Sequence, residues 1–141
     1  KLGCASDREE SGSFGDVWMT EPNLVRACLE QMQEDCGAEI TVKCRIGVDD
    51  QIPEDTLPKF LAMIEGTGVL RVTIHARKAW LRGLSPKENR DVPPLDYPVV
   101  HERKRALPGS NLSINGGVMS LTAAKKHLRA GMHGALTGRA P

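Results

Sequence analysis

Residues 69–90 read Val-Leu-Arg-Val-Thr-Ile-His-Ala-Arg-Lys-Ala-Trp-Leu-Arg-Gly-Leu-Ser-Pro-Lys-Glu-Asn-Arg, and the class of fold can be predicted from this segment. Its first part alternates apolar and polar side chains up to His75, which is the two-residue period of a β-strand. We therefore expect a strand that ends at His75, with the chemistry of an α/β protein at that end. The remainder predicts a basic loop with Trp80 among its cations. A cationic loop with an aromatic side chain is typical of RNA recognition, because unpaired bases stack on the ring.

Strand and helix patterns alternate along the rest of the chain. Further strands are predicted over residues 40–46, 112–114 and 135–137, and helices over 57–65, 99–107 and after the N-caps Thr20 and Ser120. Their apolar positions at helical spacing are Leu24, Cys28, Leu29, Met32, Leu121, Ala124 and Leu128. Successive βα units imply a parallel sheet. Including a strand before Cys4, we expect roughly four to five units, about half of a (β/α)₈ TIM barrel.

Length and composition favour one domain with a nucleic-acid or phosphate face. The chain has 141 residues, 40% of them hydrophobic, and a net charge of +1, but its bases gather between residues 71 and 105. Its four cysteines show no Cys-x-x-Cys spacing, so we expect no zinc site and no other metal. Without a signal peptide or a long apolar run, we expect free thiols, a reducing cytoplasm and no membrane partner.

Candidate site residues follow one another at the strand ends. His75 ends one strand, Asn115-Gly116-Gly117 ends the next, and Gly138-Arg139 ends the last. Glycines after a strand let backbone N–H groups approach a phosphate, and the last two βα loops of a barrel build such a site. His75 alone is more often a structural histidine.

Two other side chains carry candidate chemistry. Lys43, on the preceding strand, is suited to neutralise an anionic ring such as a reduced flavin, or else it reaches into water. Cys4 follows Gly3 in a loop, where a thiol acts as a nucleophile or proton donor, or packs as a small hydrophobe. Cys28 and Cys44 fall on core-facing patterns and are expected to pack.

The sequence resembles the tRNA-dihydrouridine synthases, and among them the A-type enzymes of bacteria and plants. The motifs that carry the resemblance are Gly-Cys-Ala-Ser-Asp-Arg (3–8), Gly-Ser-Phe-Gly (12–15), Val-Lys-Cys-Arg-Ile-Gly-Val-Asp-Asp-Gln (42–51), the whole of 75–90, Val-Pro-Pro-Leu-Asp-Tyr-Pro (92–98), Ile-Asn-Gly-Gly (114–117) and Gly-Arg (138–139). The resemblance implies an FMN-containing TIM barrel that uses NADPH to reduce a D-loop uridine of tRNA, of the 20/20a type, to 5,6-dihydrouridine. It implies also that residues 1–141 form part of that barrel, without its first strands and without a C-terminal helical tRNA-binding domain.

The resemblance also implies a role for each candidate residue. Cys4 is the acid that protonates C5 of the uracil ring, while reduced FMN delivers hydride to C6. The residues expected to bind FMN are Lys43 and His75 at the ring, and Asn115, Gly116, Gly117, Gly138 and Arg139 at the ribityl and phosphate groups. The residues expected to contact RNA are Lys1, Lys87 and Arg90.

Two other functions remain open from the residues. One is a non-catalytic remnant that binds RNA or acts as a scaffold. The other is a different FMN barrel, such as a dihydroorotate dehydrogenase-like enzyme, although a small acidic substrate needs no cationic loop. For the enzyme we expect a cytoplasmic location, or an organellar one in a plant-type source. We expect the isolated chain to need the missing half of the barrel or a partner chain.

Overall fold

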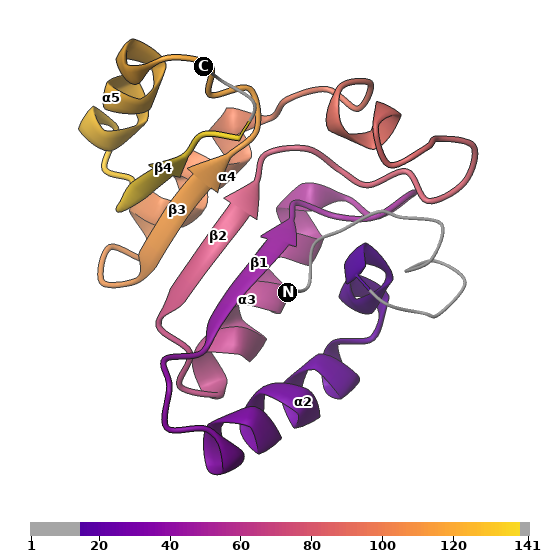
Figure 1. Ribbon diagram of the computed structural model, residues 1–141, viewed down its shortest axis with the longest axis vertical. Helices are drawn as coiled ribbons and strands as arrows, with labels where there is room; N and C mark the ends of the chain where they lie inside the picture. Colours follow the sequence, from indigo (N-terminus) through magenta and orange to yellow (C-terminus); the bar gives the residue numbers. More distant parts are fainter. Residues whose placement is uncertain (1–14, 139–141) are drawn as a thin grey trace.

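A parallel sheet backed by helices makes up the structure, a computed structural model that describes residues 15–138 (Figure 1). The elements in chain order are η1 (Gly15–Thr20), α2 (Pro22–Asp35), β1 (Thr41–Arg45), α3 (Pro53–Gly66), β2 (Arg71–His75), η2 (Glu88–Arg90), α4 (Tyr97–Ala106), β3 (Asn111–Asn115), α5 (Leu121–Arg129) and β4 (Gly134–Leu136). The strand and helix alternation predicted from the sequence is therefore confirmed.

The four strands follow the order β1-β2-β3-β4, and every pair is parallel. Each strand is joined to the next by one helix: α3, α4 and α5 in turn. Figure 1 shows α3 and α4 behind the sheet, with α2 beyond β1 and α5 beside β4. The fold is α/β with consecutive βα units, as expected for part of a TIM barrel.

The two faces of the sheet differ in polarity. Val42, Ile74 and Leu112 are buried on the face that packs against the helices, where they join the hydrophobic core with Leu57 and Ile64 of α3. Because side chains alternate along a strand, the intervening residues point to the other face. Those residues are polar, namely Thr41, Lys43, Arg45, Arg71, Thr73, His75, Asn111, Ser113 and Asn115.

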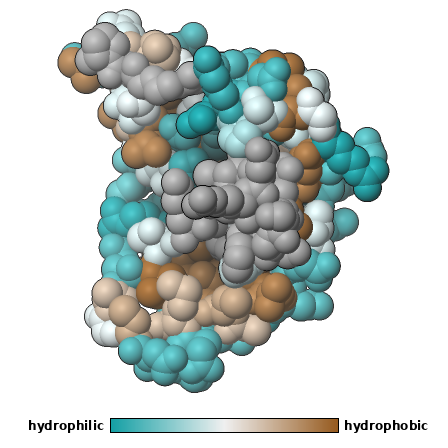
Figure 2. All heavy atoms as spheres, turned by 45° about the vertical axis from the view of Figure 1, so that its right-hand side comes forward, coloured by the Kyte–Doolittle hydropathy of each residue, from teal (hydrophilic) through white to brown (hydrophobic). Residues whose placement is uncertain are grey.

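The buried faces of two helices differ from the prediction. In α2 the core contacts come from Val25 and Leu29, whereas Leu24 and Met32 are about half exposed (48% and 49%). Figure 2 shows a group of apolar side chains in the lower part of the view, where α2 lies in Figure 1, with hydrophilic side chains below them. In α5 the buried residue is His127, while Leu121 and Leu128 are exposed. Apolar spacing alone does not reveal which stripe of a helix meets a neighbour when part of its apolar surface faces outward.

The starts of α2 and α3 also differ from the prediction. α3 begins at Pro53, four residues before the predicted start at residue 57, because a proline is well suited to the first turn of a helix. The helix continues through Pro58, with Leu57, Phe60 and Ile64 buried. α2 has no side-chain N-cap, since Thr20 instead donates its hydroxyl to the carbonyl of Val17. Ser120 is the N-cap of α5, as predicted. No helix within residues 15–138 is long and apolar enough to cross a membrane.

Candidate functional site

The carboxyl ends of the strands bring two of the predicted residues, His75 and Asn115, into one row with Arg45 and Leu136. In the register of the sheet, Arg45 of β1 pairs with His75, His75 pairs with Asn115, and Asn115 pairs with Leu136. The amide of Asn115 donates to the carbonyl of Leu136 at 2.9 Å and so ties the ends of β3 and β4 together. His75 is only 8% exposed. His75, Asn115 and Leu136 of this row line the candidate site.

Asn115-Gly116-Gly117, which we call the glycine turn, passes directly over His75. The φ angles of Gly116 and Gly117 are +98° and +65°, a conformation that favours glycine. A Cβ atom on Gly116 would lie 2.5 Å from Cδ2 of His75, and one on Gly117 would lie 2.6 Å from Cδ1 of Leu95. The turn therefore requires glycine for its conformation and for its close packing.

A cavity of about 180 Å³ opens beside this turn. Its lining combines the predicted residues of three strand ends with one cation of the basic loop and three apolar side chains: His75, Asn115, Gly116, Gly117, Gly138, Arg90, Val118, Met119 and Leu136. Arg90, predicted as an RNA contact, thus also borders the predicted cofactor residues. The cavity is large enough for a phosphate group and a short polar chain, and it is smaller than typical pockets for whole cofactors.

Lys43 lies on the same face of the sheet but one layer deeper. It pairs in register with Thr73, two residues before the row of His75, and it is half-buried. Lys87 is exposed at the start of η2 and does not line the cavity. The predictions for Cys4, Lys1 and Arg139 lie outside the described residues.

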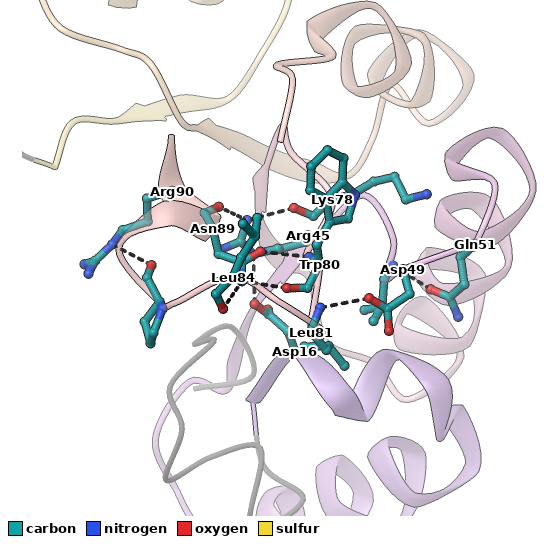
Figure 3. Close-up of polar contacts among 12 residues, drawn as sticks. Asp16, Arg45, Asp49, Gln51, Lys78, Trp80, Leu81, Leu84, Asn89 and Arg90 are labelled. Atoms are coloured by element: carbon teal, nitrogen blue, oxygen red, sulfur yellow. Dashed lines mark hydrogen bonds and ion pairs between the residues drawn. The ribbon is translucent and has the colours of Figure 1, made fainter. Parts of the chain in front are cut away.

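The basic loop (residues 76–90) is held by Asn89, a residue that the sequence pattern did not single out. Asn89 is fully buried. Its Oδ1 accepts from the backbone N–H of Trp80 at 2.8 Å, and its Nδ2 donates to the carbonyls of Trp80 (2.8 Å) and Leu84 (3.4 Å) (Figure 3). One side chain thereby fixes both sides of the tryptophan backbone.

A buried ion pair fixes the base of the same loop. Nε of Arg45 donates to Asp16 at 2.8 Å, and Nη1 of Arg45 donates to the carbonyls of Lys78 and Asn89 at 3.0 and 2.9 Å. Asp16 and Arg45 are 0% and 4% exposed. Sequence reasoning missed both, although Arg45 continues the polar alternation of its strand to the carboxyl end, a signal that could have identified it.

Two carboxylates complete the local order of the loop. Asp49 accepts from the backbone N–H of Leu81 at 2.8 Å, and Glu88 accepts from the hydroxyl and backbone N–H of Ser85 at 2.6 and 2.8 Å. The hydroxyl and then the N–H of Ser85 lower the pKa of Glu88. Glu88 therefore stays charged in a local turn with Ser85.

The described cysteines are free thiols. Burial raises the pKa of Cys44 to about 12, opposed by the charge of Lys43, so this thiol stays neutral at physiological pH. The predicted packing role of Cys44 agrees with its complete burial, whereas Cys28 is only half-buried. Within the described part of the chain, no group of three or more histidine, cysteine or acidic side chains could hold a metal ion.

Parallel βα units with a glycine-bordered cavity at the strand ends define an α/β protein of the TIM-barrel type with a candidate phosphate site. The whole chain, residues 1–141, matches the family model described as dihydrouridine synthase (Dus). The chain belongs to the dihydrouridine synthase family.

The similar proteins are bacterial enzymes named tRNA-dihydrouridine(20/20a) synthase. Identity is 47% over 138 residues with the protein of Shewanella oneidensis, 49% over 139 residues with that of Vibrio cholerae and 48% over 139 residues with that of Escherichia coli K12. In each case 98% of this chain is covered, but only 41%, 42% and 40% of the relative. The chain thus spans about two fifths of the length of the curated relatives it matches. The resemblance to this family is confirmed, and these matches give no support to a dihydroorotate dehydrogenase-like enzyme.

Proposed function

We propose that this chain forms part of an FMN-dependent tRNA-dihydrouridine synthase that uses NADPH to reduce a D-loop uridine to 5,6-dihydrouridine. The observation that carries the proposal is that one cavity is lined by His75, the glycine turn and Gly138 and also by Arg90 of the basic loop. A phosphate-sized space beside an RNA-type loop suits an enzyme that holds a phosphorylated cofactor against a nucleic acid.

The residues present fit the phosphate end of FMN. The glycine turn borders the cavity together with His75 and Gly138, so its backbone lies at the edge of a phosphate-sized space. Arg90 supplies positive charge at the rim of the same cavity. When bound and reduced, the flavin would supply hydride to C6 of the uracil ring. In our proposal Lys43 and His75 contact the ring, and Arg139 joins the phosphate contacts.

The remaining step requires a proton at C5. We assign it to the thiol of Cys4, whose S–H bond breaks as the C5–H bond forms, because a cysteine thiol is a competent acid near neutral pH. A uridine must also leave its stack to reach such a site. Lys1, Lys87 and Arg90 are the proposed RNA contacts that hold the tRNA during this step.

An activity assay tests the enzyme proposal. The chain would replace the matching 138 residues of the Shewanella oneidensis relative, and dihydrouridine would be measured in unmodified tRNA after addition of FMN and NADPH. We expect activity in this chimera, its loss in Cys4→Ala, and its retention in the matched control Cys36→Ala, since Cys36 is exposed. Full activity of the Cys4→Ala chimera would contradict the assigned proton donor. Absence of activity in the parent chimera would contradict the enzyme proposal.

A second assay examines the RNA contacts separately. We expect Lys87→Ala to weaken tRNA binding and to reduce the slope of log affinity against log salt concentration by about one, because Lys87 is exposed beside the loop cations. Lys59→Ala, which removes an exposed lysine from α3, is the control and should change neither. Binding that is equally salt-dependent in both variants would contradict the assignment. Salt-sensitive tRNA binding without FMN binding or activity would instead favour the non-catalytic, RNA-binding alternative.

A further inference from the structure

Tyr97 lies against the glycine turn, and two histidines of α4 and α5 lie against Tyr97. Tyr97 is the first residue of α4, His101 lies one turn further along the same helix, and His127 comes from α5. The hydroxyl of Tyr97 donates to the carbonyl of Gly116 at 2.7 Å. This hydrogen bond connects Tyr97 directly to the candidate phosphate site, and the two histidines are connected to that site through Tyr97.

The packing of Tyr97 against the turn is close. A Cβ atom on Gly117 would lie 2.7 Å from the hydroxyl oxygen of Tyr97, so the turn rests on that oxygen. The tyrosine ring in turn meets the ring of His127 edge-on, with centroids 4.6 Å apart and planes at 63°. Movement of the tyrosine would therefore move the carbonyl of Gly116 or break its hydrogen bond.

The two histidines form a pair that joins α4 to α5. Nε2 of His101 lies 3.0 Å from Nδ1 of His127, a hydrogen bond in which the tautomers decide the donor. His127 is 5% exposed and is the buried residue of α5, although Leu121 and Leu128 of the same helix are exposed. His127 therefore occupies the buried position of α5, where packing alone would favour an apolar side chain.

We propose that Tyr97 is a positioning residue for the glycine turn, seated by the His101–His127 pair, and that it sets the turn in the form that receives the phosphate group of the cofactor. The cofactor part of this inference rests on the proposed function. The coupling between Tyr97, the histidine pair and the turn is a property of the chain itself.

Protonation supplies a signature of this coupling. A hydrogen bond between two imidazoles needs one lone pair, so it is lost when both rings carry a proton. The cations that face the pair are Arg105 of α4 and Lys126 of α5, and Arg77 faces Tyr97 from the loop after β2. Burial, followed by the charges of its partner ring, Arg105 and Lys126, lowers the pKa of His101. Burial and then Lys126 lower that of His127.

The direction of the pH effect follows from these shifts. Because the pKa of each histidine in the folded chain lies below its ordinary value of 6.5, the paired arrangement is fully formed above pH 6.5. It is lost as the pH falls through the lower values of the folded chain. The glycine turn should change its environment over the same acidic range.

Nuclear magnetic resonance tests the coupling without any cofactor. In the ¹⁵N-labelled chain, we expect the amide signals of Gly116 and Gly117 to shift between about pH 7.5 and pH 5 with the midpoint of the imidazole signals of His101 and His127. In Tyr97→Phe, which removes only the hydroxyl, the imidazoles should still titrate and the glycine amides should not. The amide of Gly83, in the basic loop, is the internal control and should stay constant in both proteins. Glycine signals that are insensitive to pH, or that titrate unchanged in Tyr97→Phe, would overturn the proposal.

Binding of FMN tests the consequence for the cofactor. In the chimera described above, Tyr97→Phe should weaken FMN binding at pH 7.5 by about fivefold to tenfold, as expected for one hydrogen bond. The affinity of the parent should fall below pH 6.5, and the affinity of Tyr97→Phe should depend less on pH. Equal affinities and equal pH profiles would overturn the positioning role. If the parent chimera bound no FMN at any pH, the proposed function would fail. The resonances of Gly116 and Gly117 would still test the coupling to Tyr97. They would be measured in the chimera if the isolated chain self-associates.

Discussion

At the scale of single residues, the ion pair between Asp16 and Arg45 fixes the base of the basic loop. Removal of Asp16 would leave the guanidinium of Arg45 buried without its carboxylate. We expect Asp16→Ala to lower the free energy of unfolding by about 3–5 kcal/mol, because breaking a buried pair exposes the full cost of desolvating the remaining charge. Urea denaturation followed by circular dichroism would measure the loss.

A surface pair in the same chain provides the matched control. Glu39 and Arg71 form an ion pair at 3.1 Å, but their side chains are 60% and 46% exposed. We expect Glu39→Ala to cost less than about 1 kcal/mol, because water and salt screen such a pair. If the two variants lost similar amounts of unfolding free energy, the buried pair would stabilise the fold no more than the surface pair, contrary to our expectation. Asp16→Asn, which keeps the shape of the side chain, serves if Asp16→Ala does not fold.

At the scale of elements, α5 depends on its first residue. The hydroxyl of Ser120 accepts from the backbone N–H of Ala123 at 3.1 Å, so Ser120→Ala should lower the free energy of unfolding by about 1 kcal/mol. Thr20→Ala is the comparison, because Thr20 precedes α2 without capping it and should cost less. Thermal denaturation of the two variants would show the difference. An equal or larger loss for Thr20→Ala would contradict the caps seen in the structure.

The strands could be predicted from the sequence, and the helix faces could not. Alternation over Val42–Lys43–Cys44 and over the residues before His75 specifies a strand locally, because the period of two depends only on the backbone. Which stripe of α2 or α5 is buried depends on neighbours that a single segment does not contain. His127 illustrates the limit: its burial follows from contacts with Tyr97 and His101 of another helix.

The candidate site was also predictable from the sequence only in part. The sequence could place His75, Asn115 and the glycines near one another because strand ends of a parallel sheet converge, and these residues line one cavity. Asn89 was missed, since a single asparagine in a polar loop gives no sign that it will be fully buried. Its role arises only when the loop folds back over Trp80.

At the scale of the whole molecule, apolar surface remains beside the sheet. A groove of about 540 Å³ lies between α2 and β1 and is lined by apolar side chains that include Trp18, Leu29 and Ile40. Among the described residues, β1 and β4 each pair with a strand on one side only. Unpaired strand edges and exposed apolar grooves promote association.

We therefore expect the isolated chain to self-associate, or to require a partner or the remainder of a barrel for solubility. Sedimentation velocity over a range of protein concentrations would measure this tendency. A folded, monodisperse monomer at high concentration would contradict the expectation. The chimera with the Shewanella oneidensis relative is the control, since its barrel supplies neighbours for both edges, and it should sediment as one species.

We propose that the glycine turn and the row of strand ends bind a phosphorylated flavin. Quenching of flavin fluorescence in matched glycine variants of the chimera measures the FMN affinity that tests this binding. Gly116 and Gly131 have nearly equal φ angles, +98° and +96°, but only a Cβ on Gly116 would meet other atoms within 4 Å. We predict that Gly116→Ala weakens FMN binding by about tenfold or more, equivalent to about 1.4 kcal/mol, and that Gly131→Ala leaves it unchanged. Equal affinities of the two variants, or no FMN binding by the parent protein, would contradict a flavin site at the glycine turn.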